Sequence, residues 1–117
     1  PAAGLDPDER FRLREIVAER RQRATVVMST HLTQEAAYCD TVLVLNDGRP
    51  VFVGSPQRLA ATASGRTWRQ HGRPDGVRAS WLQADGSHRC LGDPPVGAEL
   101  VEPTLEDGYL LLVGAGR

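Results

Sequence analysis

The sequence predicts an α/β fold, and three observations lead to this prediction. Residues 25–29 and 41–45 are short, apolar and rich in β-branched side chains, which is typical of strands covered on both faces. Helix start signals alternate with these runs along the first half of the chain. From Gly65 onward the composition changes to Gly, Arg, Asp and Ser, so we expect two domains, residues 1–64 and a small α+β region of residues 65–117.

Composition limits the classes of function that this chain can support. The net charge is -1 and all 14 basic residues are arginines, so we expect no nucleic-acid partner and no lysine-dependent chemistry. Cys39 and Cys90 belong to no CxxC pair, so we expect reduced thiols in a cytoplasmic protein and no metal site. No apolar run reaches the ~18 residues that a membrane-spanning helix needs.

The first element is predicted to be a helix from Asp6 to about Arg21. Asp6 can cap the helix, Pro7 suits its first position, and Asp8 and Glu9 meet the positive end of the helix dipole. The apolar residues that fall roughly on one side of this helix are Phe11, Leu13, Ile16 and Val17.

A buried strand is predicted next, at residues 25–29, with Ser29-Thr30-His31 at its exit. The carboxyl end of such a strand is where open α/β sheets bind ligands, which makes His31 a candidate site residue. Thr33 is expected to cap a short helix that runs through Tyr38. A strand buried on both faces needs parallel neighbours, so we expect the first ~55 residues to be the last part of a doubly wound domain.

A hairpin and a helix are predicted to follow. Asn46-Asp47-Gly48 is a turn signal between a strand at residues 41–45, expected to be covered on both faces, and a partner at 49–53. Pro50 indicates that this partner lies at an edge. Ser55-Pro56 predicts a helix that ends near Ala63.

The second region is predicted to contain short strands and one final helix. Strands are expected near residues 67–69, 77–82, 88–91 and 98–101, with Asp-Gly turns between them. Thr104 is expected to cap the final helix, with Glu106 and Asp107 in its first turn rather than acting as metal ligands. Trp68 and Trp81 are interpreted as packing residues.

Taken in order, several short motifs resemble the ATP-binding subunits of ABC transporters. These motifs are Gly4-Leu5-Asp6, Ser29-Thr30-His31, Cys39-Asp40, Asn46-Asp47-Gly48 and Gly54-Ser55-Pro56, and they cover roughly residues 1–63. The resemblance implies a P-loop NTPase sheet, of which this chain would hold the C-terminal part beginning just after the Walker B strand, followed by the α+β appendage. In addition, residues 103–110 resemble the end of subunits that serve exporter-type permeases.

The resemblance also implies roles for individual residues. His31 matches the switch histidine of the H-loop, which contacts the γ-phosphate of ATP. Gly4, Leu5 and Asp6 match the D-loop, which lies at the interface between two nucleotide-binding domains. The implied partners are thus ATP with Mg²⁺, a second nucleotide-binding domain in a homodimer or heterodimer, and a transmembrane permease subunit. The implied location of the protein is cytoplasmic, peripheral at the cytoplasmic face of the cell membrane.

Other motifs of this family do not occur in the sequence. Walker A, the signature motif and the Walker B carboxylates that bind Mg²⁺ are missing. We therefore expect this chain alone not to hydrolyse ATP, whereas the parent protein would use ATP to drive transport, with export expected. Two alternatives stay open: a soluble, non-transport ABC ATPase, and a non-catalytic regulatory or interaction module derived from one.

Overall fold

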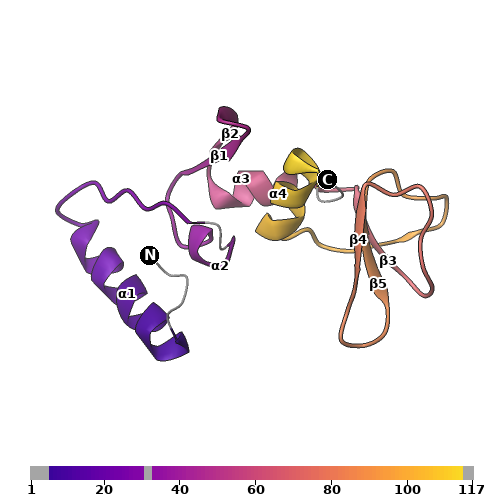
Figure 1. Ribbon diagram of the computed structural model, residues 1–117, viewed down its shortest axis with the longest axis horizontal. Coiled ribbons are helices and arrows are strands. Elements are labelled where there is room, and N and C mark those ends of the chain that lie inside the picture. The colour runs from indigo at the N-terminus through magenta and orange to yellow at the C-terminus, as the bar shows by residue number, and fades with distance from the viewer. Residues whose placement is uncertain (1–5, 31–32, 115–117) are drawn as a thin grey trace. The chain divides into compact units, whose positions relative to one another are not determined.

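The structure is a computed structural model that describes residues 6–30 and 33–114, and the chain divides into two units, Pro1–Cys39 and Asp40–Arg117. In its described part, the first unit has helices α1 (Pro7–Arg20) and α2 (Thr33–Ala36) (Figure 1). The elements of the second unit are β1 (Val42–Asn46), β2 (Arg49–Gly54), α3 (Pro56–Ala61), β3 (Thr67–Gln70), β4 (Ala79–Leu82), β5 (His88–Leu91), β6 (Glu99–Leu100) and α4 (Leu105–Val113). The described part is therefore mixed α/β, and its sheets are antiparallel rather than parallel.

Helix α1 begins as the sequence predicts. The Asp6 carboxylate accepts a hydrogen bond of 2.9 Å from the amide of Glu9, and Pro7 occupies the first turn. The helix ends at Arg20, one residue before the expected end. None of its residues is buried, and Phe11 and Ile16 are 54% and 50% exposed, so the expected apolar side covers no core in this unit.

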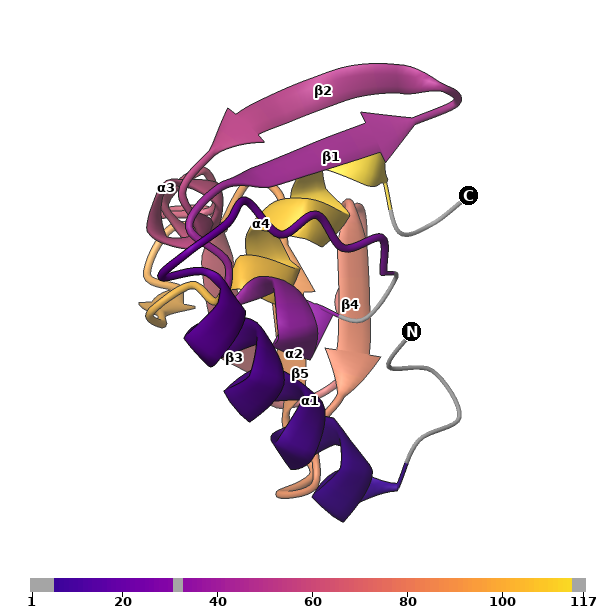
Figure 2. The same cartoon turned by 90° about the vertical axis from the view of Figure 1, so that its left-hand side faces the viewer.

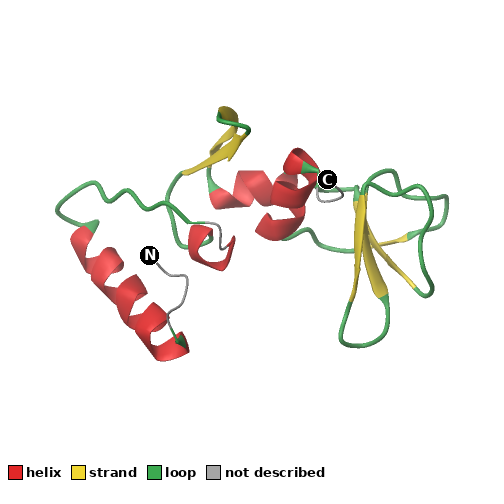
Figure 3. Ribbon diagram, in the orientation of Figure 1, coloured by secondary structure: helices red, strands yellow, loops and turns green. Residues whose placement is uncertain are grey.

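The segment between the two helices differs from the prediction. Residues 21–30 form turns and irregular backbone, so the buried strand expected at residues 25–29 is wrong (Figure 3). Val27 is 90% exposed. A strand covered on both faces needs strands on either side, and the described strands pair elsewhere. The short helix α2 already includes Thr33, which was expected to be its cap, and it ends before Tyr38.

Strands β1 and β2 form the expected hairpin (Figure 2). Asp47 and Gly48 both have positive φ angles, 54° and 75°, which is the backbone of a type I′ turn. The prediction that the first strand is covered on both faces is wrong. Val44 is buried, but Leu43 and Leu45 are 55% and 56% exposed, because this two-stranded sheet has a covering layer on one face only among the described residues.

The second sheet has the strand order β4-β5-β3-β6. The core on one face of this sheet joins the turn after α3 and helix α4 to strands β4 and β5. It consists of Ala63, Ala79, Leu91 and Leu111, with Trp81 and Leu110 packed against it. On the other face, Trp68 and Cys90 lie opposite one another and are 1% and 0% exposed. The packing role predicted for the two tryptophans is confirmed, as are the strands expected in this region.

Helices α3 and α4 are capped as predicted and pack closely against each other. Ser55 caps α3, and Thr104 forms a capping box with Asp107 at the start of α4. A Cβ atom on Gly108 would overlap the carbonyl oxygen of Leu59, so glycine permits this close approach of the two helices. Helix α3 precedes and helix α4 follows the domain boundary that the sequence predicts between residues 64 and 65. That boundary stays a prediction.

Candidate functional site

The described structure shows one of the four residues that the sequence places in the site. Asp6 is exposed at the start of α1, where its Oδ1 atom accepts from the backbone of Glu9. Gly4, Leu5 and His31 lie outside the described residues, so their roles stay predictions. Asp6 therefore has a structural role as a helix cap, which is compatible with a second role at an interface.

A buried carboxylate lies four residues after His31, on helix α2. Glu35 is only 2% exposed and is held by the guanidinium of Arg14 from α1. Nη2 of Arg14 lies 3.1 Å from Oε1 of Glu35, and Nε lies 3.4 Å from Oε2. This hydrogen bond raises the pKa of the Arg14 guanidinium. The arrangement is the two-pronged pairing by which arginine recognises a carboxylate.

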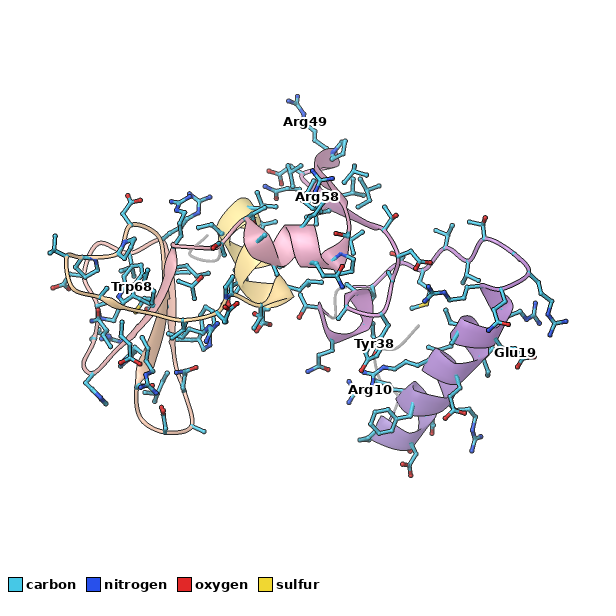
Figure 4. The ribbon with its side chains drawn as sticks, turned by 180° about the vertical axis from the view of Figure 1, so that it is seen from behind. Arg10, Glu19, Tyr38, Arg49, Arg58 and Trp68 are labelled. Atoms are coloured by element: carbon cyan, nitrogen blue, oxygen red, sulfur yellow. The ribbon has the colours of Figure 1, made fainter. Side chains whose placement is uncertain are left out.

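Two aromatic rings hold the same guanidinium in place. The carbon at its centre lies 5.1 Å from the ring centroid of Phe11 and 4.4 Å from that of Tyr38, both within the range of a cation–π interaction. Figure 4 shows Tyr38 between the short helix and α1. Arg14 and its three partners thus join the helix that follows Asp6 to the helix that follows His31.

Sequence reasoning did not find this cluster. Arg14 and Glu35 are 21 residues apart, and each looks like an ordinary surface charge when read along the chain. One usable signal was present: Phe11 and Arg14 are three residues apart on a predicted helix, so their side chains share one face. That spacing does not identify a partner in another helix.

Other candidate ligands in the described residues have structural partners. Both oxygens of Asp107 accept from Arg89, at 2.6 Å and 3.0 Å, and Oδ2 also accepts from the amide of Thr104 at 2.7 Å. The first-turn role predicted for Asp107 is confirmed, and Glu106 lies in the same turn. Among the described residues, no group of three or more His, Cys, Asp or Glu side chains could hold a metal ion, and no helix is long and apolar enough to cross a membrane.

No protein-family model matches this chain. It is 32% identical over 121 residues to the energy-coupling factor transporter ATP-binding protein EcfA2 of Lacticaseibacillus paracasei, which covers all of this chain and 40% of that protein. It is 32% identical over 144 residues to the probable multidrug ABC transporter ATP-binding protein YbhF of Escherichia coli, covering 99% of the chain and 25% of that protein.

A third relative matches a shorter stretch of this chain at higher sequence identity. The EcfA2 protein of Streptococcus sanguinis is 44% identical over 61 residues, which cover 50% of this chain and 22% of that protein. The chain thus spans at most 40% of the length of these relatives. The comparisons confirm the resemblance that the sequence motifs predict: along its whole length, this chain is similar to part of the ATP-binding proteins of ABC transporters.

Proposed function

We propose that this chain supplies the D-loop and the switch histidine of an ABC transporter subunit that binds and hydrolyses ATP to drive transport. The observation that supports this most strongly is the 32% identity to an ABC ATP-binding protein over the whole chain. The order of the motifs supports it too, because Asp6 stands before His31 with one helix between them, as the resemblance requires.

In this proposal His31 acts on the terminal phosphate of ATP. An imidazole N–H directed at a transferring phosphoryl group stabilises the charge that develops there and helps to orient the attacking water. Gly4, Leu5 and Asp6 face a second nucleotide-binding domain. The exposure of Asp6 supports this role, since its carboxylate caps α1 and is also accessible to a partner surface.

ATP is proposed to bind with Mg²⁺ in the complete subunit. Mg²⁺ at nucleotide sites is usually held by one or two carboxylates together with the phosphates of the substrate. The sequence contains neither a Walker A motif nor the Walker B carboxylates, so we assign the metal ligands and the phosphate-binding loop to other parts of the complete subunit. The purified 117-residue chain is then expected to release no phosphate from ATP.

The partners and the location belong to the same proposal. The subunit would work with a membrane permease at the cytoplasmic face of the membrane. Export is favoured because one relative is described as a multidrug transporter subunit and residues 103–110 resemble the end of exporter subunits. The capping box of Thr104 and Asp107 shows that this end segment forms a well-defined helix start.

The test is steady-state phosphate release by the complete ATP-binding protein that carries this sequence. We expect His31→Ala to lower kcat about 100- to 1,000-fold, the usual cost of losing a donor to the developing charge. His71→Ala is the matched control, because His71 is exposed in a loop far from these motifs in the sequence, and it should leave the rate unchanged. Undiminished turnover in His31→Ala would refute the assignment.

A second substitution separates the two roles of Asp6. Asparagine caps a helix about as well as aspartate, so Asp6→Asn keeps α1 intact while it removes the charge. A fall in turnover with unchanged helix content would support the D-loop role. An absence of turnover in the unmodified complete protein would instead favour the non-catalytic module.

A further inference from the structure

We propose that Asp75, in the loop between strands β3 and β4, is a site of isoaspartate formation, the spontaneous covalent rearrangement of an Asp-Gly pair. The modified residue exposes a free α-carboxylate, which makes it a substrate for methyltransferases that recognise isoaspartate. Asp75 lies outside the motifs of the proposed function, so this site does not depend on that function. The chain contains four Asp-Gly pairs, which begin at Asp47, Asp75, Asp85 and Asp107, and the structure restrains them differently.

The rearrangement has two steps and consumes nothing but water. The backbone nitrogen of Gly76 attacks Cγ of the protonated Asp75 carboxyl group, a C–N bond forms, and the C–OH bond breaks so that the hydroxyl leaves as water with the amide proton. Water then adds to the α-carbonyl carbon of the five-membered succinimide ring and breaks the bond from that carbon to nitrogen. The main chain now runs through Cγ and the α-carboxylate is free. No atom is oxidised or reduced, and the mass of the chain is unchanged.

Two conditions decide how fast an Asp-Gly pair reacts in a folded protein. The amide nitrogen and Cγ must approach to about 3–3.5 Å in the right orientation. Any hydrogen bond that holds the carboxylate or the amide must break first, which adds to the barrier. Glycine favours the approach, because it has no Cβ atom to hinder rotation of the backbone. The pair whose two groups are least restrained is therefore expected to react first.

Asp75 and Gly76 meet both conditions. Both residues are exposed, and Gly76 has nothing within 4 Å of the position that a Cβ atom would take. Among the described residues, no backbone–backbone hydrogen bond involves residues 71–77. The Asp75 carboxylate and the Gly76 amide also have no hydrogen-bond partner in the described part of the chain. The two reacting groups are therefore free to rotate towards each other.

Asp85-Gly86, in the turn between β4 and β5, is the opposite case. The hydroxyl and the amide of Ser87 donate to Oδ1 of Asp85 at 2.6 Å and 2.9 Å, and the amide of Gly86 donates to the carbonyl of Gln83 at 3.0 Å. The hydrogen bonds from Ser87, the hydroxyl first, lower the pKa of Asp85, which reduces the protonated fraction that can release water. Both reacting groups of this pair are therefore held.

The other two pairs are also restrained. Asp107 is fully buried with its carboxylate in an ion pair, and the amide of Gly108 donates to the carbonyl of Thr104 at 3.1 Å. Asp47-Gly48 forms the type I′ turn that closes the β1–β2 hairpin, so the paired strands on both sides limit the rotation of its backbone. Asp75-Gly76 is thus the least restrained of the four pairs.

The experiment follows isoaspartate in the complete ATP-binding protein during incubation at mildly acidic pH. Peptides from a digest are analysed by electron-transfer dissociation mass spectrometry, which distinguishes isoaspartate from aspartate at each position. Isoaspartate is expected to accumulate at Asp75 about tenfold faster or more than at Asp85 or Asp107, the effect on a rate of one hydrogen bond to a charged group. Equal rates at Asp75 and Asp85, or no isoaspartate at Asp75, would overturn the proposal.

Incubation of the same protein in urea is the matched control. Unfolding breaks the hydrogen bonds that hold Asp85 and Asp107, so the rates at these two sites should rise towards the rate at Asp75. A tenfold difference that persists in urea would mean that the neighbouring sequence, and not the folded structure, selects Asp75. That result would overturn the inference.

A variant tests the chemistry at Asp75 itself. Asp75→Glu keeps the charge, but its reaction would require a six-membered ring, which closes more slowly. An isoaspartate methyltransferase with labelled S-adenosylmethionine is therefore expected to label the peptide that contains residue 75 in the unmodified protein and to leave it unlabelled in Asp75→Glu. Equal labelling of the two peptides would contradict the assignment.

A second variant tests the protection of Asp85. Ser87→Ala deletes the hydroxyl that donates at 2.6 Å, so isoaspartate at Asp85 should rise while the rate at Asp75 stays the same. No rise at Asp85 would contradict the selection of the site by hydrogen bonds. Tryptophan fluorescence checks that the variant folds, and if it does not, the comparison in urea decides.

Discussion

The two units of this chain are stabilised in different ways. In the described part of Pro1–Cys39, α1 buries no side chain, and the buried residue of α2 is a charged one, Glu35. In Asp40–Arg117, the turn after α3 and helix α4 share a hydrophobic core with strands β4 and β5. Both units contain a two-pronged arginine–carboxylate pair, Arg14 with Glu35 and Arg89 with Asp107, but the second pair accompanies an apolar core.

This difference shows where the local sequence pattern is sufficient to predict the structure. The second unit contains apolar strands and capped helices, and these elements pack against one another within the unit. The apolar residues of the first unit, such as Val27 and Phe11, are exposed, so they form no apolar core among the described residues of that unit. The following changes test the comparison, and the two tryptophans, Trp68 and Trp81, make fluorescence a probe of the second unit alone.

The largest effect is expected from Arg89→Ala. This change leaves the fully buried carboxylate of Asp107 without its charged partner, which typically costs about 3–5 kcal/mol. Urea unfolding followed by tryptophan fluorescence should show the loss. Arg69→Ala, which breaks more exposed pairs with Asp85 and Glu99, should cost less than about 1 kcal/mol. Equal losses of unfolding free energy in the two variants would mean that burial does not distinguish the Arg89 pair from the Arg69 pairs.

The second largest effect is expected from Gly108→Ala, which should destabilise the protein although a glycine-to-alanine change normally stabilises a helix. Alanine normally stabilises a helix interior by about 1 kcal/mol relative to glycine. Here the added methyl group would overlap the backbone of Leu59, and such overpacking typically costs about 1–3 kcal/mol. The urea midpoint of the fluorescence transition should fall. Glu106→Ala, exposed in the same helix, is the control and should change it little.

Asp6→Ala should have a smaller effect, confined to the first unit. Losing the side-chain cap costs about 1 kcal/mol of helix stability, and no buried residue of α1 compensates for the loss. We expect a lower helix signal in far-ultraviolet circular dichroism while the fluorescence transition stays in place. A shift of the fluorescence transition would contradict this expectation.

The smallest effect concerns pH and Asp85. The hydroxyl of Ser87 donates a hydrogen bond of 2.6 Å to the Asp85 carboxylate, and the backbone amide of Ser87 donates one of 2.9 Å. Both hydrogen bonds lower the pKa of Asp85, the hydroxyl more than the amide. Because the folded-state pKa is the lower one, this stabilisation is present above the ordinary carboxyl pKa of about 4 and is lost as the pH falls through the folded value. Urea midpoints of the parent chain and of Asp85→Asn should therefore converge at low pH, and parallel profiles would contradict this.

The parts of the fold that the sequence predicts are those controlled by neighbouring residues. Asp6, Ser55 and Thr104 cap helices as expected, and Asp47-Gly48 forms the hairpin turn, because each depends on a few adjacent backbone groups. Residues 25–29 show the limit, since a strand exists only where another strand can pair with it. The order of the motifs in the sequence predicts the resemblance to ABC transporter ATP-binding proteins. The pairing of Arg14 with Glu35 depends on tertiary structure, which no local sequence pattern contains.

The hairpin turn also decides on which side this small sheet can grow. Asn46 and Arg49 pair beside the turn, which places Pro50 at the next, non-hydrogen-bonded position, where its nitrogen faces away from β1. Proline has no N–H to donate, and the register shift at Leu45 further interrupts the outer edge of β2. A third strand that joins this sheet, in an assembly or in an aggregate, therefore finds its regular row of donors and acceptors along β1.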